Sequence, residues 1–404
     1  MLIERGKALA YWAFVGAVVA ASFSNSFFEI FSIGYLLVAS ALLIFEKRWE
    51  FLKNGLAVLA GLYFLAAILS LTQTQYWDNS LKGIFRILRC VLMCFLTPYA
   101  VDTRQKFKTA FYVIAVGVMV IGLDAILQAV TGFDLIRGRM MTTYTHDAGR
   151  VTGPFRHAND FSAYLSLMSF LFFGMIPHAF LQKDLKKRIF FMAGSVVAAL
   201  CLLWTYARGA WLAVGISFVA MAIFKRNRTL ILGMVLFGVT AFLFSSPSLQ
   251  FRIRTLGDVQ SGTFTERRFL WGESLRMIGQ KPWLGYGVNT YSKMEPYFKS
   301  KEIHTDYQYA HNGYLQMAAE MGLVGLGSFL LFLVSFFISM ARSLIPHDAE
   351  FTRAAAASIV FGVLAFLLHS ATDTDLQSLR LVSVLWLSMG LALAAKKTLG
   401  SPPA

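Results

Sequence analysis

Apolar runs of about 20 residues recur along the whole chain, with short polar connections between most of them. The runs do not alternate apolar and polar residues, as the roughly 10-residue strands of a membrane β-barrel do. The pattern therefore predicts an all-α polytopic membrane protein with about twelve transmembrane helices. The predicted spans lie near residues 8–24, 27–45, 52–71, 83–101, 109–130, 161–180, 189–206, 209–224, 229–246, 319–341, 354–371 and 379–395.

Two connections are much longer than the others, roughly 131–160 and 247–318. We predict three parts: transmembrane helices in 1–246, a large periplasmic loop with short amphipathic helices in 247–318, and the last helices with a short cytoplasmic tail in 319–404. No small-x-small cleavage site follows the first apolar run, so we interpret that run as a retained span rather than a signal peptide.

Composition agrees with a membrane protein. Of the 404 residues, 57% are hydrophobic and 15% charged, whereas soluble domains average about 45–50% and about 25%. The three cysteines, Cys90, Cys94 and Cys201, lie in apolar runs and are expected to be small buried side chains. A net charge of +15 would suggest nucleic acid in a soluble protein, but here we expect no nucleic-acid partner.

Lysine and arginine predict the orientation in the membrane, because cytoplasmic loops are enriched in them. They gather at the N-terminus and in every second connection: Arg5, Lys7, Lys47, Arg48, Lys53, Arg104, Lys106, Lys108, Lys183, Lys186, Lys187, Arg188, Lys225, Arg226, Arg228, Arg342, Arg353, Lys396 and Lys397. Both termini are therefore predicted to be cytoplasmic. The two long connections then lie outside and are themselves basic, which suggests an anionic partner such as a phosphorylated lipid, although long loops translocate largely regardless of charge.

Three charged residues lie inside predicted spans. Arg86 and Arg89 lie in the fourth span and Asp124 in the fifth, all about equally deep from the outer side. Intramembrane charges are costly and normally paired. Two interpretations stay open: a structural ion pair, or an arginine that faces a cavity and binds phosphate.

Basic residues next to the long outer loop are candidates for anion binding. Arg208 lies in a very short external turn. Its planar guanidinium group can donate two hydrogen bonds to a diphosphate. Alternatively, the side chain snorkels to the membrane interface. In "TERRFLWGESLRMIG", Arg267 shares a helical face with Trp271, Ser274 and Ile278, so it is predicted to point inward, with Arg268 at the edge of that face. A buried functional role and a salt bridge both fit this position.

The stretch "YAHNGYLQMAAEMG" places His311 and Asn312 directly before an apolar run. His311, Leu315, Ala318 and Gly322 are predicted to share one helical face, with His311 near the N-terminus. The helix dipole there disfavours the imidazolium and so favours the neutral ring that a general base requires. A structural histidine at an interface is the alternative interpretation.

Two metal-like patterns are set aside. The "DTD" at 373–375 resembles the metal-binding DxD of nucleotide-sugar transferases, but it falls in a predicted external loop, where nucleotide sugars are not supplied. His304 and His311 lack a third ligand at zinc spacing. We therefore expect no metal and no cofactor.

Four segments, in order, resemble the O-antigen ligase and O-antigen polymerase family of bacterial envelope glycosyltransferases. They are "GPFRHANDFSAYL", "ARGAWLA", "RRFLW" followed by "KPWLGYG", and "HNGYLQMAAEMGLVG", within residues 153–325. The resemblance implies metal-independent, inverting transfer of a glycan from undecaprenyl diphosphate at the periplasmic face of the bacterial inner membrane. Arg208 and Arg267 would hold the diphosphate, and His311 would orient or deprotonate the acceptor hydroxyl. Arg268, Arg156, Arg86, Arg89 and Asn312 are further candidates for binding the diphosphate or the acceptor.

The resemblance leaves two enzymes open. A ligase transfers the polymer to the lipid A core of lipopolysaccharide, and a polymerase transfers it to the next lipid-linked repeat unit. We favour the ligase, partly because "ARGAWLAV" resembles ligase segments. A transporter of lipid or polysaccharide is a third alternative, but the sequence shows neither the inverted repeats nor the broken helices that are common in transporters.

Overall fold

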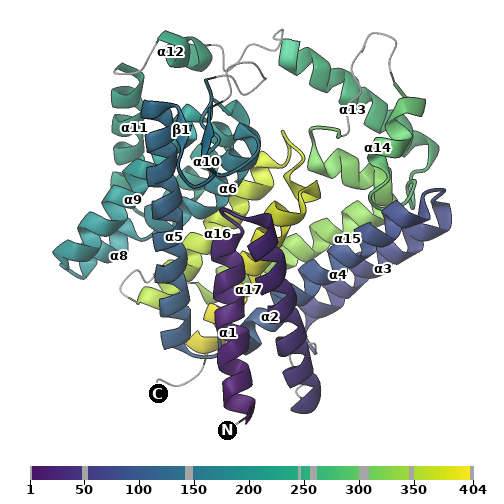
Figure 1. The fold of residues 1–404 in the computed structure, drawn as a ribbon, viewed down its shortest axis with the longest axis horizontal. Helices are drawn as coiled ribbons and strands as arrows, with labels where there is room; N and C mark the ends of the chain where they lie inside the picture. The colour runs from purple at the N-terminus through teal and green to yellow at the C-terminus, as the bar shows by residue number, and fades with distance from the viewer. Residues whose placement is uncertain are drawn as a thin grey trace.

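The computed structural model describes residues 2–47, 53–141, 149–243, 247–254, 262–299, 309–344 and 350–400, and almost all of its regular structure is helical (Figure 1). The helices are α1 Leu2–Ala20, α2 Asn25–Phe45, α3 Gly55–Ser70, α4 Trp77–Ala100, α5 Arg104–Thr131, α6 Ala158–Met168, α7 Phe170–Phe173, α8 Ile176–Leu181, α9 Leu185–Trp204, α10 Arg208–Phe224, α11 Arg228–Leu243, α12 Pro247–Arg254, α13 Gly262–Gln280, α14 Tyr291–Met294, α15 Gly313–Ser343, α16 Phe351–His369 and α17 Leu379–Leu399. Short 3-10 turns are η2 Leu71–Gln73, η3 Glu295–Tyr297 and η4 Asp375–Gln377. Two short antiparallel strands, β1 Phe133–Asp134 and β2 Arg139–Met140, form a hairpin after α5.

The all-α membrane class predicted from the sequence is confirmed. In the described residues, eight helical segments are long and apolar enough to cross a membrane. The other four predicted spans coincide with α1, α4, α10 and α11. Because these four do not meet the same criteria of length and composition, the count of twelve stays a prediction, as do the large periplasmic loop and the division into three parts.

Polar contacts tie several helix ends together at one end of the bundle. Lys7 at the start of α1 pairs with Glu46 just after α2, at 3.0 Å, and Tyr99 near the end of α4 donates to the same carboxylate at 2.9 Å. Arg104 Nε, at the start of α5, donates to the carbonyl of Thr398 near the end of α17 at 3.1 Å. The chain therefore begins and ends at the same end of the bundle, as the predicted topology requires. Which side of the membrane this end faces stays a prediction.

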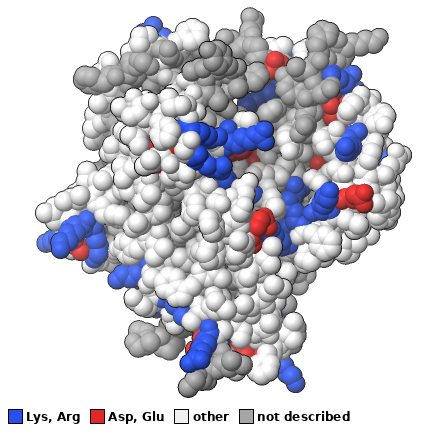
Figure 2. Space-filling model, in the orientation of Figure 1, with Lys and Arg blue, Asp and Glu red and all other residues white. Residues whose placement is uncertain are grey.

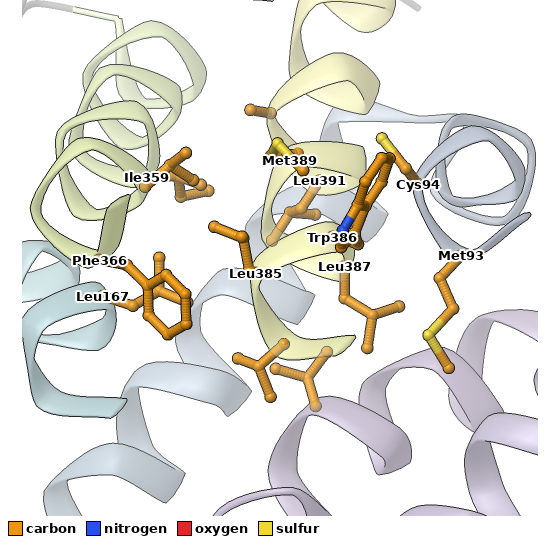
Figure 3. Packing of buried hydrophobic residues seen from close by; sticks show 14 of the residues in the cluster. Met93, Cys94, Leu167, Ile359, Phe366, Leu385, Trp386, Leu387, Met389 and Leu391 are labelled. Atoms are coloured by element: carbon orange, nitrogen blue, oxygen red, sulfur yellow. The ribbon is translucent and has the colours of Figure 1, made fainter. Parts of the chain in front are cut away.

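Helix α17 lies at the centre of the apolar core (Figure 3). Its buried residues Leu385, Trp386 and Leu387 pack among side chains of α4, α6 and α16. A Cβ at Gly390 would lie 2.6 Å from the carbonyl oxygen of Cys94, so only glycine allows α17 to approach α4 this closely. All three cysteines are buried, as predicted.

Two predicted continuous spans are interrupted, which corrects the expectation that the chain has no broken helices. The span predicted at 161–180 is divided into α6, α7 and α8. Within α15, Gly322 has φ 67 and ψ −175 and does not continue the helix. The cause is a loop: the N–H groups of Tyr286 and Gly287 donate to the carbonyls of Ala319 and Glu320 at 3.1 and 2.8 Å.

Candidate functional site

Asp373, in the loop between α16 and α17, brings together three segments that are far apart in the sequence. Its Oδ1 lies 3.2 Å from His311 Nδ1, and its Oδ2 lies 3.9 Å from Arg267 Nη2. Asn159 Nδ2 in α6 donates to Oδ2 at 2.7 Å. Two of the three predicted catalytic residues, His311 and Arg267, therefore meet at one buried carboxylate.

The Asp373 loop is fixed by its own contacts. Asp375 Oδ2 lies 2.7 Å from His369 Nδ1, so the two aspartates of "DTD" contact two different histidines. Arg86 donates to the carbonyl of Gln377 at 2.8 Å and to its side-chain oxygen at 2.9 Å. Among the described residues, no group of three histidine, cysteine, aspartate or glutamate side chains is arranged to hold a metal ion.

The two aspartates differ in electrostatic environment. Burial alone would raise the pKa of Asp373, but the hydrogen bond from His311, together with the charges of His311, His369 and Arg267, outweighs burial and lowers that pKa below its ordinary value. Burial dominates at Asp375 and raises its pKa, although His369 opposes the shift. The ionised form is therefore favoured more strongly at Asp373 than at Asp375.

His311 lies just outside α15 rather than within it. Its backbone has φ 48, and Asn312 is the N-cap, whose Oδ1 accepts the N–H groups of Tyr314 and Leu315 at 3.0 Å each. The N–H of Gly313 donates to the carbonyls of Ser370 and Asp373 at 2.8 and 3.0 Å, which fixes this turn against the Asp373 loop. The predicted helical face from His311 to Gly322 is wrong at both ends, because the helix starts after His311 and is interrupted at Gly322.

The inward orientation predicted for Arg267 agrees with the structure of α13. The side chain of Arg267 is 24% exposed and reaches Asp373, whereas Arg268 is exposed. Leu270, Ser274 and Met277 on the same side of the helix are buried. Of the two neighbouring arginines, Arg267 is the one that contacts the cluster.

Arg208 is the first residue of α10, in the short turn after α9 that the sequence predicted. The next residue, Gly209, packs against the Asp373 loop, since a Cβ there would lie 2.2 Å from Thr372 Oγ1. Arg150 reinforces this region: it donates to the carbonyl of Thr205 at 2.7 Å and to Asn159 Oδ1 at 2.6 Å. The start of α10 therefore lies beside the loop that carries Asp373.

The intramembrane charges have partners inside the protein, but not the expected ones. Arg89 forms an ion pair with Glu29 of α2 at 2.7 Å and its guanidinium lies 5.0 Å from the Phe28 ring. Asp124 Oδ1 accepts the N–H groups of Leu135 and Ile136, at 2.9 and 3.2 Å, and so anchors the β1–β2 hairpin. These contacts favour the structural interpretation for Arg89, and Arg86 positions the loop that carries Asp373. A phosphate-binding role for either arginine stays a prediction.

Arg156 lies in a separate cavity with Arg137, Arg139 and Arg380, and does not join Arg267 and His311. Sequence reasoning missed Asp373 and Asn159 as members of the candidate site. The available signal for Asp373 is the "DTD" motif in the short polar connection between two predicted spans, a motif that the sequence suggests only as a metal site. Asn159 lies in "GPFRHANDFSAYL", one of the segments that carry the family resemblance.

The fold and the cluster define a multi-pass helical membrane protein with a His–Asp–Arg site at the end of the bundle opposite the chain termini. A family model described as O-antigen ligase matches residues 193–330, a segment that includes Arg208, Arg267 and His311, and this match confirms the resemblance to the O-antigen ligase family. The family indicates a glycosyltransferase-type enzyme of O-antigen assembly that uses lipid-linked glycan and lipid acceptor substrates in general. No curated protein matches the chain.

Proposed function

We propose that this protein is an O-antigen ligase, which transfers a glycan from undecaprenyl diphosphate to the lipid A core of lipopolysaccharide at the periplasmic face of the inner membrane. The observation that carries the proposal is the convergence of His311 and Arg267 on Asp373. A base, a carboxylate that orients it and a guanidinium for a phosphate leaving group are the groups that glycosyl transfer from a lipid diphosphate requires.

His311 is the proposed general base. With Nδ1 protonated and donating to Asp373, the ring presents an unprotonated Nε2 to the acceptor hydroxyl. The hydroxyl oxygen attacks the anomeric carbon while its proton moves to Nε2 and the bond to the diphosphate oxygen breaks. Inversion follows from this single displacement. The Asp373 carboxylate stabilises the imidazolium that forms.

Arg208 and Arg267 are the proposed diphosphate ligands. The diphosphate leaves with the bonding electron pair, and two guanidinium groups near it stabilise the developing negative charge. Supporting evidence is that the start of α10 packs against the Asp373 loop and that Arg267 contacts Asp373 itself. Arg268 is exposed beside them and is assigned a secondary role in attracting anionic substrate.

An apolar groove between α9, α10 and α11 supports a lipid-linked donor. Its volume is about 710 Å³. Leu203 and Trp211 line it close to the turn that carries Arg208, and Asn227 and Thr229 line it at the other end of α10. The 17 residues of α10 rise about 25 Å, most of the thickness of a bilayer core. We propose that the polyisoprenyl chain lies in this groove with its diphosphate near Arg208.

A deletion strain distinguishes the ligase from the polymerase. Without a ligase, the lipid A core carries no O-antigen and polymer accumulates on undecaprenyl diphosphate. Without a polymerase, the core is capped with a single repeat unit. If a lipopolysaccharide gel shows cores capped with one repeat unit, the protein is a polymerase and the ligase proposal is wrong. A normal ladder of long chains would count against both enzymes.

Turnover by the purified protein tests the chemistry. We expect transfer from a lipid diphosphate donor without any ion gradient, which a transporter would not catalyse. His311→Ala should abolish transfer, and EDTA should leave the wild-type rate unchanged. Strong EDTA inhibition that a divalent cation reverses would instead favour a metal role for Asp373 and Asp375.

A further inference from the structure

A second cavity, of about 530 Å³, lies beside the reaction centre and is unusually rich in arginine. Its walls come from the start of α2, the β1–β2 hairpin, the segment before α6 and the start of α17. Four arginines line it: Arg137, Arg139, Arg156 and Arg380. Figure 2 shows basic side chains gathered on this face of the molecule, above the α1–α2 hairpin.

Local acidic groups do not balance these charges. Arg139 pairs with Asp134 at 3.2 Å, and Glu29 in the cavity wall already pairs with Arg89. Asp160 is the other acidic residue of the wall and interacts with Arg380. Within the described part of the chain, Arg137 and Arg156 have no acidic side chain at ion-pair distance. The cavity therefore has excess positive charge.

Contacts hold Arg380 in the cavity, and Arg137 lies near it. Arg380 donates to Asn25 Oδ1 at 3.0 Å, and its guanidinium lies 3.9 Å from the centre of the Phe155 ring. Arg137 is near enough to Arg380 for their charges to interact unfavourably. A bound anion reduces the repulsion between like charges that share a cavity, and a planar guanidinium group can donate two hydrogen bonds to phosphate oxygens.

The first turn of α6 separates this cavity from the reaction centre. Asn159 contacts Asp373 at 2.7 Å, and the next residue, Asp160, lines the arginine cavity. The proposed diphosphate ligands, Arg208 and Arg267, do not line the cavity. An anion bound there would therefore be next to the reacting groups without taking the place of the leaving diphosphate.

We propose that the arginine cavity binds a phosphate group of the acceptor glycolipid and thereby presents the acceptor sugar to His311. The proposal rests on the glycosyl transfer proposed above. The apolar side chains of Phe28, Leu379 and Leu381 in the same wall suit a ligand that joins a phosphate to a lipid.

Binding to the purified full-length protein in nanodiscs tests this proposal without any turnover. The probes are lipid A with both phosphates, the same lipid with its phosphates removed, and inorganic phosphate. The test variant is Arg137→Ala/Arg156→Ala. The matched control is Lys82→Ala/Lys293→Ala, which removes two exposed cations outside the cavity. We expect the test variant to bind phosphorylated lipid A at least about tenfold more weakly, and the control to bind it like wild type.

Three outcomes would overturn the proposal: equal binding of the dephosphorylated lipid, equal loss in the control variant, or inorganic phosphate binding as tightly as the lipid. The last outcome would indicate a site for the free ion. Arg137→Lys/Arg156→Lys keeps the charge and should restore part of the affinity if the test variant is folded. If wild-type protein binds phosphorylated lipid A but transfers no glycan, the proposed function fails and the presentation of the sugar to His311 fails with it, whereas phosphate binding in the cavity stands. If it transfers glycan but shows no phosphate-dependent binding, only the cavity proposal fails.

Discussion

His311 Nδ1 lies 3.2 Å from Asp373 Oδ1, although 62 residues separate the two in the chain. The contact holds the imidazole ring against the carboxylate, and the proposed chemistry assigns Nδ1 to Asp373 and Nε2 to the acceptor hydroxyl. Asp373 also contacts Asn159 and Arg267, so one carboxylate orients the proposed base and one of the proposed phosphate ligands.

Replacing Asp373 by asparagine should reduce kcat on the order of 100-fold, because an amide can hydrogen-bond Nδ1 but cannot stabilise the imidazolium. Initial rates of the purified variants measure the loss. Asp375→Asn is the comparison, because Asp375 contacts His369 instead. An Asp373→Asn enzyme with the wild-type kcat would reduce Asp373 to a packing role.

Asp373 also predicts a pH dependence of stability. Its pKa is lower in the folded protein than in the unfolded chain, whose value is about 3.9. Its contribution is therefore complete above the unfolded pKa and is lost as the pH falls through the folded pKa. Thermal unfolding of wild type and Asp373→Asn should differ between pH 5 and 7, and the difference should shrink below about pH 4. A difference that grows toward acid pH would contradict this sign.

The ability of a guanidinium group to bind two phosphate oxygens gives a separate prediction. Arg208→Lys and Arg267→Lys should each lose at least about tenfold in activity while expressing normally, because lysine cannot bind two phosphate oxygens at once. Arg268→Ala should be milder, since Arg268 is exposed. Transfer rates with purified variants measure the order of effects. If Arg268→Ala is the most damaging of the three, the catalytic arginine has been misassigned.

The orientation in the membrane can be tested by labelling. A cysteine in place of Ser292, an exposed residue of α14, should react with an impermeant reagent from outside intact cells. One in place of Ser401, which lies outside the described residues, should react only after the membrane is opened. These results follow from the lysine and arginine asymmetry of the connections. External labelling of Ser401→Cys would reverse the orientation and place the His311–Asp373 pair in the cytoplasm.

Helix periodicity explains what could be predicted from the sequence and what could not. The inward orientation of Arg267 followed from an angle of about 100° per residue, which is a local property. The role of Asp373 depends on its contact with Asn159, which is 214 residues away. Such a contact cannot be predicted from the local sequence pattern around either residue. The break at Gly322 was also missed, because the apolar pattern runs through it and the cause is a loop from 282–287.

That loop makes Gly322 a sensitive position. A Cβ there would lie 2.1 Å from the carbonyl oxygen of Trp283, and the φ of 67 favours glycine. Gly322→Ala should therefore destabilise the protein by about 2 kcal/mol or more and detach the loop from α15. Gly327→Ala, in the same helix with no atom within 4 Å of its Cβ, is the control. Thermal unfolding in detergent compares the two, and equal midpoints would mean that the loop contact contributes nothing to stability.

The groove between α9, α10 and α11 allows a test of where the donor lipid lies. Gly215 lines the groove, and no atom lies within 4 Å of a Cβ built there, so a side chain can be introduced at this position without a clash at Cβ. Gly215→Trp should raise the KM for a polyisoprenyl diphosphate donor at least about tenfold, because it occupies space that the chain requires. The KM for the acceptor should not change.

Gly61→Trp is the matched control for this change. Gly61 is exposed on α3, also has no atom within 4 Å of its Cβ, and is not among the residues that line the groove. It should leave both KM values at the wild-type level. A donor with a short isoprenoid chain sharpens the test, because a ligand that fills only the part of the groove near Arg208 should be affected less by Gly215→Trp. If Gly215→Trp binds long-chain donor as well as Gly61→Trp does, the donor lipid lies elsewhere, whatever the outcome for His311 and the arginines.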